Sequence, residues 1–212
     1  MSAGLKAVAW DIDGTLVDSE PLHHRSLVLG SADVGADLSD LSDQAFRGVH
    51  MHDVWAALRP RLPLSLGEDE WLIAIEDRYV AERRTLAAMP GAVETIAALA
   101  ARGVPQVCVS NSSRRLVDAN LDALGIARHV AFSISLDDVG AGKPDPEPYR
   151  TACLRLALPP ATVAAVEDSG TGAASARAAG LYTVGYRPAG GGFGAVDLAV
   201  DSLARVAALF GL

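Results

Sequence analysis

LKAVAWDIDGT, residues 5–15, joins a short apolar run to two aspartates and a glycine. Further short apolar runs follow, with helical patterns between them. They are VPQVCVS at 104–110, VAFSIS at 130–135, TVAAVE at 162–167 and LYTVGY at 181–186. Strands that alternate with helices predict a parallel sheet covered by helices on both faces. The stretch at 5–15 is therefore interpreted as the first strand of an α/β domain.

Residues 19–89 interrupt this alternation, because they contain amphipathic helical stretches and no clear strand. Apolar side chains recur there at helical spacing; they include Trp71, Leu72, Ile75, Tyr79 and Val80. We interpret this stripe as the core of a helical subdomain rather than as a cofactor-binding surface. Pro90 and Gly91 then mark the return to the sheet. The predicted domains are a sheet domain over 1–18 and 90–212 and a helical domain over 19–89.

Composition narrows the classes of partner. The 212 residues carry 18 Lys and Arg against 26 Asp and Glu, a formal charge of −8, and the basic residues are scattered. This pattern argues against a nucleic-acid partner. No apolar run reaches the ~20 residues of a membrane-spanning helix, and the amino terminus lacks a signal-peptide pattern. We expect a cytoplasmic protein, a monomer or weak dimer, that binds neither nucleic acid nor membrane, with Cys108 and Cys153 as buried free thiols.

Polar side chains follow four predicted strands in turn. They are Asp11, Asp13, Gly14 and Thr15 after the first, Ser110, Asn111 and Ser112 after the second, Lys143 after the third, and Glu167, Asp168 and Ser169 at the fourth. Each group alone has a structural explanation as a turn, a helix cap or a solvated loop. Because parallel strands bring their carboxyl ends to one edge, the groups together supply oxygen ligands for Mg²⁺ and donors for a phosphoryl group.

These residues resemble, in order, the four motifs of the haloacid dehalogenase superfamily. The matching segments are DIDGT at 11–15, the serine of VSNS at 110, the lysine of GKPDP at 143 and VEDS at 166–169. The resemblance covers nearly the whole chain, and DSEPLHHRS at 18–26 with the helical insert resembles the β-phosphoglucomutase and phosphoglycolate phosphatase branch. It implies a doubly wound, Rossmann-like core of strand order 5-4-1-2-3 with a mobile helical cap.

The resemblance also implies a role for each motif residue. Asp11 matches the nucleophile and a metal ligand, Asp13 the general acid and base with its backbone carbonyl on Mg²⁺, and Asp168 a further metal ligand. The phosphate-binding set that it implies comprises Gly14, Thr15, Ser110, Asn111 and Lys143. Glu167 and Ser169 match supporting positions. The implied enzyme is a Mg²⁺-dependent phosphatase that acts on a small phosphorylated metabolite, such as a sugar phosphate or a phosphoglycolate-like acid, through an aspartyl-phosphate.

A dehalogenase, a phosphohexose mutase and a non-catalytic binding protein are alternative functions on this fold. Hydrolytic dehalogenases lack the second carboxylate that is present here as Asp13, which favours phosphate chemistry. A phosphohexose mutase would share His23 and the Glu167–Asp168 pair, but Met51 and Ala81 stand where β-phosphoglucomutase carries an arginine and a lysine. A non-catalytic binding protein is disfavoured because every motif side chain is intact.

Three histidines in the helical insert are candidates for substrate binding. His50 and His52 are spaced to share one face of an extended segment, where a metal pair is conceivable. They lack nearby Cys or His partners, so we interpret them as a surface that faces substrate. His23 is a candidate for a hydrogen bond near the site.

Overall fold

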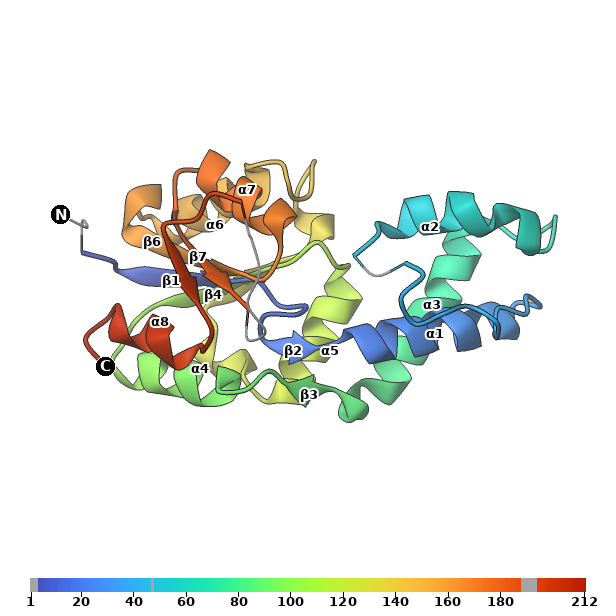
Figure 1. Cartoon of the computed structure of the whole chain (residues 1–212), viewed down its shortest axis with the longest axis horizontal. Coiled ribbons are helices and arrows are strands. Elements are labelled where there is room, and N and C mark those ends of the chain that lie inside the picture. Colours follow the sequence, from blue (N-terminus) through green and yellow to red (C-terminus); the bar gives the residue numbers. More distant parts are fainter. Residues whose placement is uncertain (1–3, 47, 188–193) are drawn as a thin grey trace. The chain divides into compact units, whose positions relative to one another are not determined.

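The computed structural model describes residues 4–46, 48–187 and 194–212 (Figure 1). The chain divides into two compact units. A sheet unit comprises Met1–Asp18 and Ala87–Leu212, and a helical unit comprises Ser19–Leu86. The insertion therefore leaves and re-enters the sheet unit between the first and second strands of its main sheet.

The main sheet has six parallel strands in the order β5-β4-β1-β6-β7-β8. The strands are β1 (Ala7–Trp10), β4 (Gln106–Val109), β5 (Phe132–Ile134), β6 (Val163–Glu167), β7 (Tyr182–Tyr186) and β8 (Leu198–Val200). Taken in chain order, the first five strands reproduce the predicted order 5-4-1-2-3, which is confirmed. The sequence analysis missed β8, a three-residue strand of which only Val200 is buried.

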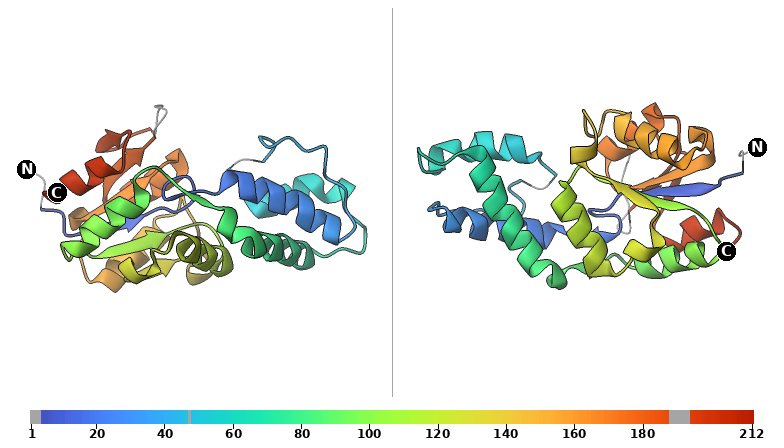
Figure 2. Two further views of the ribbon diagram at one scale, coloured as in Figure 1. Left: turned by 90° about the horizontal axis from the view of Figure 1, so that it is seen from below. Right: turned by 180° about the vertical axis from the view of Figure 1, so that it is seen from behind.

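Helices cover both faces of this sheet, as the alternating pattern predicted. They are α4 (Ala92–Ala101), α5 (Arg114–Leu124), α6 (Glu147–Leu156), α7 (Gly170–Ala178) and α8 (Ala204–Ala208). Helices α6 and α7 lie on one face, and α4, α5 and α8 lie on the other (Figures 1 and 2). Helix α5 ends where Gly125 adopts a left-handed backbone with φ of 65°, a conformation in which a side chain would be strained.

The central strands are buried along their whole length, which is why their sequences read as continuous apolar runs. Trp10 is fully buried, and its indole Nε1 donates to Gln106 Oε1 at 3.0 Å. The same residue is in register with Cys108 of β4 and Val166 of β6. The carboxyl ends of the three strands therefore reach one edge together. Cys108 and Cys153 are free and buried, as predicted.

The helical unit contains three α-helices, α1 (Glu20–Asp33), α2 (Met51–Leu58) and α3 (Glu68–Glu82), among its described residues. The predicted stripe on α3 does form core, because Trp71, Ile75 and Tyr79 are buried. Trp71 Nε1 donates to the buried Ser31 Oγ of α1 at 2.8 Å. These two helices pack so closely that a Cβ at Gly30 would lie 2.6 Å from Ile75 Cα. None of the described helices is long and apolar enough to cross a membrane.

A short antiparallel ribbon, which the sequence did not indicate, lies where the chain leaves and re-enters the sheet unit. Strands β2 (Val17–Asp18) and β3 (Ala87–Ala88) pair, and Met89 N donates to Leu16 O at 2.9 Å. Two-residue strands are too short for a recognisable alternation. The two connecting segments therefore run side by side.

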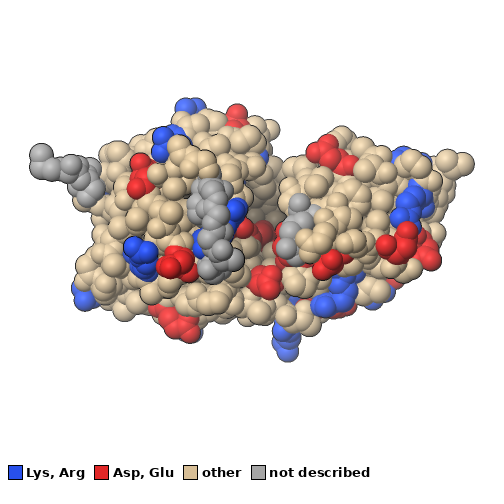
Figure 3. Space-filling view, viewed as in Figure 1, with Lys and Arg blue, Asp and Glu red and all other residues tan. Residues whose placement is uncertain are grey.

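Charged side chains of both signs are interspersed on one face of the molecule (Figure 3). On the face shown in Figure 3, the described Lys and Arg residues are scattered among Asp and Glu and form no continuous basic surface. This distribution agrees with the scattered basic residues of the sequence.

Candidate active site

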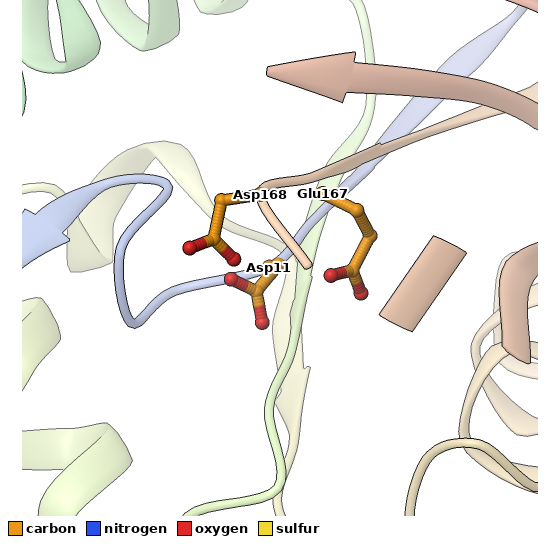
Figure 4. Close-up of side chains that lie close together, drawn as sticks. All are labelled: Asp11, Glu167 and Asp168. Atoms are coloured by element: carbon orange, nitrogen blue, oxygen red, sulfur yellow. The ribbon is translucent and has the colours of Figure 1, made fainter. Parts of the chain in front are cut away.

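Three carboxylates meet at the carboxyl ends of β1 and β6. Asp11 follows β1 directly, Glu167 is the last residue of β6, and Asp168 comes next. One oxygen from each of them lies within 4.8 Å of the others (Figure 4). Asp11 and Glu167 are buried, with exposed fractions of 7% and 0%. The sheet therefore concentrates negative charge at one point that water reaches poorly.

Lys143 is the cation that the structure places inside this cluster. Its Nζ donates to Asp11 Oδ1 at 2.7 Å, to Glu167 Oε1 at 2.6 Å and to Val109 O at 2.8 Å. The alternative of a solvated loop lysine is thereby excluded. Burial works to lower the pKa of Lys143, but the charges of Asp11 and Glu167 outweigh burial and raise it above the usual range. Lys143 thus remains an ammonium.

One ammonium does not balance three carboxylates. Burial, together with the charge of Asp11, raises the pKa of Asp168 to about 7. Burial also raises the pKa of Glu167 to about 8, although the ammonium of Lys143 opposes this rise. The pKa of Asp11 is raised by burial too, again against Lys143. Gathering like charges in this way is unfavourable without a further cation.

The residues present fit a divalent cation. Asp11 Oδ2 is buried and has no hydrogen-bond partner among the described residues. Asp11 belongs to the same acidic group as Asp168. Carboxylate oxygens are the protein ligands that Mg²⁺ prefers. An orphaned carboxylate oxygen in an excess of negative charge is the environment that such an ion would complete.

Gly14 makes room for Asp168. A Cβ at this position would lie 2.2 Å from Asp168 Oδ2, and the backbone φ is 81°. Both the contact and the left-handed backbone require glycine. The N–H groups of Gly14 and Thr15, expected to face phosphate, donate within the turn to Val17 O at 2.9 Å and Ile12 O at 3.2 Å.

The Asp13 carboxylate lies in a different environment from the three clustered carboxylates. Its Oδ2 accepts from Ser110 Oγ at 3.2 Å and from Ser112 Oγ at 2.9 Å. Its Oδ1 accepts from Asn120 Nδ2 of α5 at 3.2 Å. Asn120 is fully buried, and it could not be recognised in the sequence, because one amide within an amphipathic helical pattern has no motif around it. The predicted contact between Asp13 and metal, through its backbone carbonyl, stays a prediction.

Asn111 joins two of the loops that carry site residues. Its Nδ2 donates to Lys143 O at 2.9 Å, and its Oδ1 accepts from Lys143 N at 2.7 Å. These two hydrogen bonds from the Asn111 side chain to the Lys143 backbone hold the loop that carries the lysine. Ser169, by contrast, caps α7, since its Oγ accepts from Gly172 N at 3.1 Å.

Tyr149 of α6 is a second residue that the sequence analysis missed. It is fully buried, and its hydroxyl donates to Glu167 Oε1. The available signal was its position shortly after Lys143 in GKPDPEPY. That segment alone does not show which strand the tyrosine faces.

The helical unit holds the three candidate histidines. The ring of His23 lies 4.7 Å from that of Tyr79, centroid to centroid. His52 is exposed and pairs with Glu68 Oε1 at 2.9 Å, and His50 directly precedes α2. The expectation that His50 and His52 share a face of an extended segment is wrong, because a helix begins at Met51 and residues two apart on a helix point in different directions.

Comparison with known proteins identifies the family. The model of the haloacid dehalogenase-like hydrolases matches residues 5–180, which contain every strand end of the site. The chain belongs to this family. The resemblance seen in the sequence is confirmed, and the phosphatase relatives described next show that the chain is a hydrolase of phosphoric monoesters.

Relatives in this family include enzymes with named substrates. A phosphoglycolate phosphatase of Cupriavidus necator is 33% identical over 218 residues, covering 96% of this chain and 92% of that protein. A validoxylamine A 7'-phosphate phosphatase of Streptomyces hygroscopicus subsp. limoneus is 29% identical, with coverages of 85% and 84%. Among solved structures, CbbY of Rhodobacter sphaeroides in complex with phosphate has a TM-score of 0.87 at 27% identity and covers 98% of this chain and 100% of that one.

Proposed function

We propose that this haloacid dehalogenase-like hydrolase is a Mg²⁺-dependent phosphatase that passes through a phosphorylated Asp11. The environment of the Asp11 carboxylate carries the proposal. Lys143 binds Oδ1 at 2.7 Å, whereas Oδ2 is buried without a partner among the described residues. A carboxylate with one oxygen fixed and the other free for a ligand is suited to hold a cation while it acts as a nucleophile.

Asp11 and Asp168 would hold Mg²⁺, together with the backbone carbonyl of Asp13. When bound, the ion supplies positive charge that offsets the repulsion between a phosphate dianion and the site carboxylates. Lys143 and Ser110 would hold the phosphoryl oxygens, and Asn111 would keep the Lys143 loop in place. Gly14 and Thr15 would form the floor of this phosphate site.

In the first step, a carboxylate oxygen of Asp11 attacks phosphorus. A bond forms between that oxygen and phosphorus, the ester bond between phosphorus and oxygen breaks, and the leaving oxygen takes a proton from Asp13. In the second step, Asp13 removes a proton from a water molecule as the water oxygen attacks phosphorus. The bond from Asp11 to phosphorus then breaks, so one ester and one water give one alcohol and one phosphate.

Asp13 must change partners for this sequence of steps. As described above, its carboxylate accepts hydrogen bonds from Ser110, Ser112 and Asn120. Rotation of the Asp13 side chain toward the ester oxygen would also free the Ser110 hydroxyl for a phosphoryl oxygen. The resting hydrogen bonds thus keep both groups close to the site until substrate arrives.

The proposed substrate is a small metabolite with one phosphate group, either a sugar phosphate or a phosphoglycolate-like acid. The names of the relatives, which act on phosphoglycolate and on validoxylamine A 7'-phosphate, support this class. The phosphoryl-transfer groups all come from the sheet unit, so we propose that the helical unit is a cap that selects the leaving group. His23, His50 and His52 are the candidates for this selection.

Phosphate release from an aryl phosphate and from a panel of sugar phosphates and phosphorylated short acids tests the proposal. We expect exhaustive chelation to abolish release and added Mg²⁺ to restore it. Full activity after chelation would overturn the metal site. Isomerisation of a sugar phosphate without net release of phosphate would instead identify a mutase.

A further inference from the structure

Tyr149 contacts two members of the charged network at once. Its hydroxyl donates to Glu167 Oε1, and the centroid of its ring lies 5.3 Å from Lys143 Nζ. The side chain is fully buried on α6. An aromatic ring beside an ammonium is favourable, so both ends of the tyrosine interact with the pair formed by Lys143 and Glu167.

The surroundings of Glu167 show what the hydroxyl does. Glu167 Oε1 accepts from both Lys143 Nζ and Tyr149, whereas Oε2 has a long contact of 3.4 Å with Ser169 Oγ. The first turn of α7 also lies close to this carboxylate, because a Cβ at Gly172 would be 1.8 Å from Oε2. The better hydrogen bonds of the carboxylate are therefore on Oε1, the oxygen that Lys143 contacts.

Glu167 also has an alternative partner. Its carboxylate belongs to the same acidic group as Asp11 and Asp168, so it could turn toward a cation there. A turn of this kind would remove one of the three acceptors of Lys143 Nζ, leaving Asp11 Oδ1 and Val109 O. The ammonium would then be free to move away from Asp11 Oδ1.

We propose that Tyr149 is a positioning residue, whose hydroxyl keeps Glu167 paired with Lys143 and thereby keeps the ammonium directed at Asp11 Oδ1. On this assignment, Glu167 serves the lysine, and the cation is left to the two aspartates. The kinetic part of the inference rests on the proposed function. The part that concerns the directions of Glu167 and Lys143 does not.

The test compares Tyr149→Phe with Tyr182→Phe. The first variant keeps the ring beside Lys143 and removes only the hydroxyl. Tyr182 begins β7, where it is in register with Ala164 of β6, so the second variant makes the same chemical change near the amino ends of these strands. Three measurements are made on the parent and both variants: steady-state kinetics with an aryl phosphate, calorimetric binding of Mg²⁺ to the metal-free protein, and the melting temperature. A crystal structure of Tyr149→Phe is also determined.

We expect Tyr149→Phe to lower kcat by about tenfold and to change KM by less than about twofold. The reason is that the position of the Lys143 ammonium relative to Asp11 affects the transition state more than the binding of substrate. Calorimetry should give a Mg²⁺ affinity equal to or tighter than that of the parent. Without the Tyr149 hydroxyl, the Glu167 carboxylate can turn toward the cation and supply a further ligand beside Asp11 and Asp168. Tyr182→Phe should leave kcat, KM and Mg²⁺ affinity unchanged. A merely structural tyrosine would lower the melting temperature without this split between kcat and KM.

Several results would overturn the inference. They are a kcat within about twofold of the parent, a Mg²⁺ affinity that falls in Tyr149→Phe, or a Tyr182→Phe variant with the same kinetic defect. If the parent protein itself releases no phosphate, the proposed function fails and the crystal structure decides the inference. We then expect Lys143 Nζ to lie more than about 3.5 Å from Asp11 Oδ1 in Tyr149→Phe, and an unchanged network would overturn the inference.

Discussion

The helical unit and the sheet unit bury different kinds of side chain. Among its described residues the helical unit buries apolar groups and three serines, Ser19, Ser26 and Ser31, and its ion pairs lie at the surface. The sheet unit buries Asp11, Lys143 and Glu167. Removing ions from water costs several kcal/mol for each ion, whereas exposed ion pairs contribute about 0–1 kcal/mol. Arg78 with Asp33 is one such exposed pair. The ions buried in the sheet unit therefore serve the chemistry of the site, whereas the side chains buried in the helical unit serve packing.

The largest expected effect is that of Asp11→Asn. An amide keeps the shape of the side chain but is a poor nucleophile toward phosphorus, so we expect kcat to fall by at least about a thousandfold. The fold should persist, because the substitution removes one negative charge from a group that has too many. Turnover of an aryl phosphate and circular dichroism check this expectation. A rate within about tenfold of the parent would contradict the assignment of chemistry to the sheet unit.

A second experiment compares Gly14→Ala with Gly91→Ala. Both glycines have a positive φ, 81° and 78°, so each substitution strains the backbone by about 1 kcal/mol. A Cβ at Gly14 meets Asp168 Oδ2 at 2.2 Å, whereas a Cβ at Gly91 meets nothing within 4 Å. We expect a Mg²⁺ affinity about tenfold weaker in Gly14→Ala alone, together with similar losses of unfolding free energy in both variants. Equal affinities by calorimetry would show that Asp168 does not hold the ion.

The metal-free protein should become less stable as the pH rises. The pKa of Asp168 is raised to about 7 and that of Glu167 to about 8, while both groups have pKa values near 4 in an unfolded chain. Between about pH 4 and 8 the folded state therefore binds protons that the unfolded state has lost, and its stability falls as pH rises through this window.

Melting temperatures measured from about pH 5.5 to 8.5 check this sign, in a range where carboxyl groups of ordinary pKa no longer titrate. We expect the melting temperature of the metal-free protein to fall by a few degrees over the range. Saturating Mg²⁺ should remove most of the fall, because the ion competes with protons for the same oxygens. A melting temperature that rises with pH would contradict the excess of buried negative charge.

The smallest expected effects come from the helical unit. His52→Ala removes an exposed pair with Glu68, so the unfolding free energy should change by less than about 1 kcal/mol. We expect this variant and His50→Ala to alter the ratio of rates among sugar phosphates and phosphorylated acids by about two- to fivefold. Hydrolysis of a small aryl phosphate serves as the control and should change less. If every substrate changed by one factor, or none changed, these histidines would have no part in selection.

The sequence alone determined the order of the first five sheet strands, the family and the residues at the strand ends. The residues at the strand ends could be located because strand and helix periods are local properties, and because parallel strands bring their carboxyl ends to one edge whatever the details of packing. The strand order and the family followed from the resemblance of the four motifs to the haloacid dehalogenase superfamily. The apolar face of α3 followed from the same local periodicity. The sequence analysis missed β2 and β3, because two residues are too few for a recognisable alternation, and it also missed β8.

Only the tertiary structure decided which polar groups meet. It places Asn120, which is 107 residues from Asp13 in the chain, against the Asp13 carboxylate, and Tyr149 of α6 against Glu167 of β6. It also directs Lys143 at Asp11 and turns Asp13 away toward two serines. The physical reason is that a hydrogen bond depends on distance and direction within a few tenths of an ångström. The packing of helices against the sheet sets those quantities, and the spacing of residues along the chain does not record them.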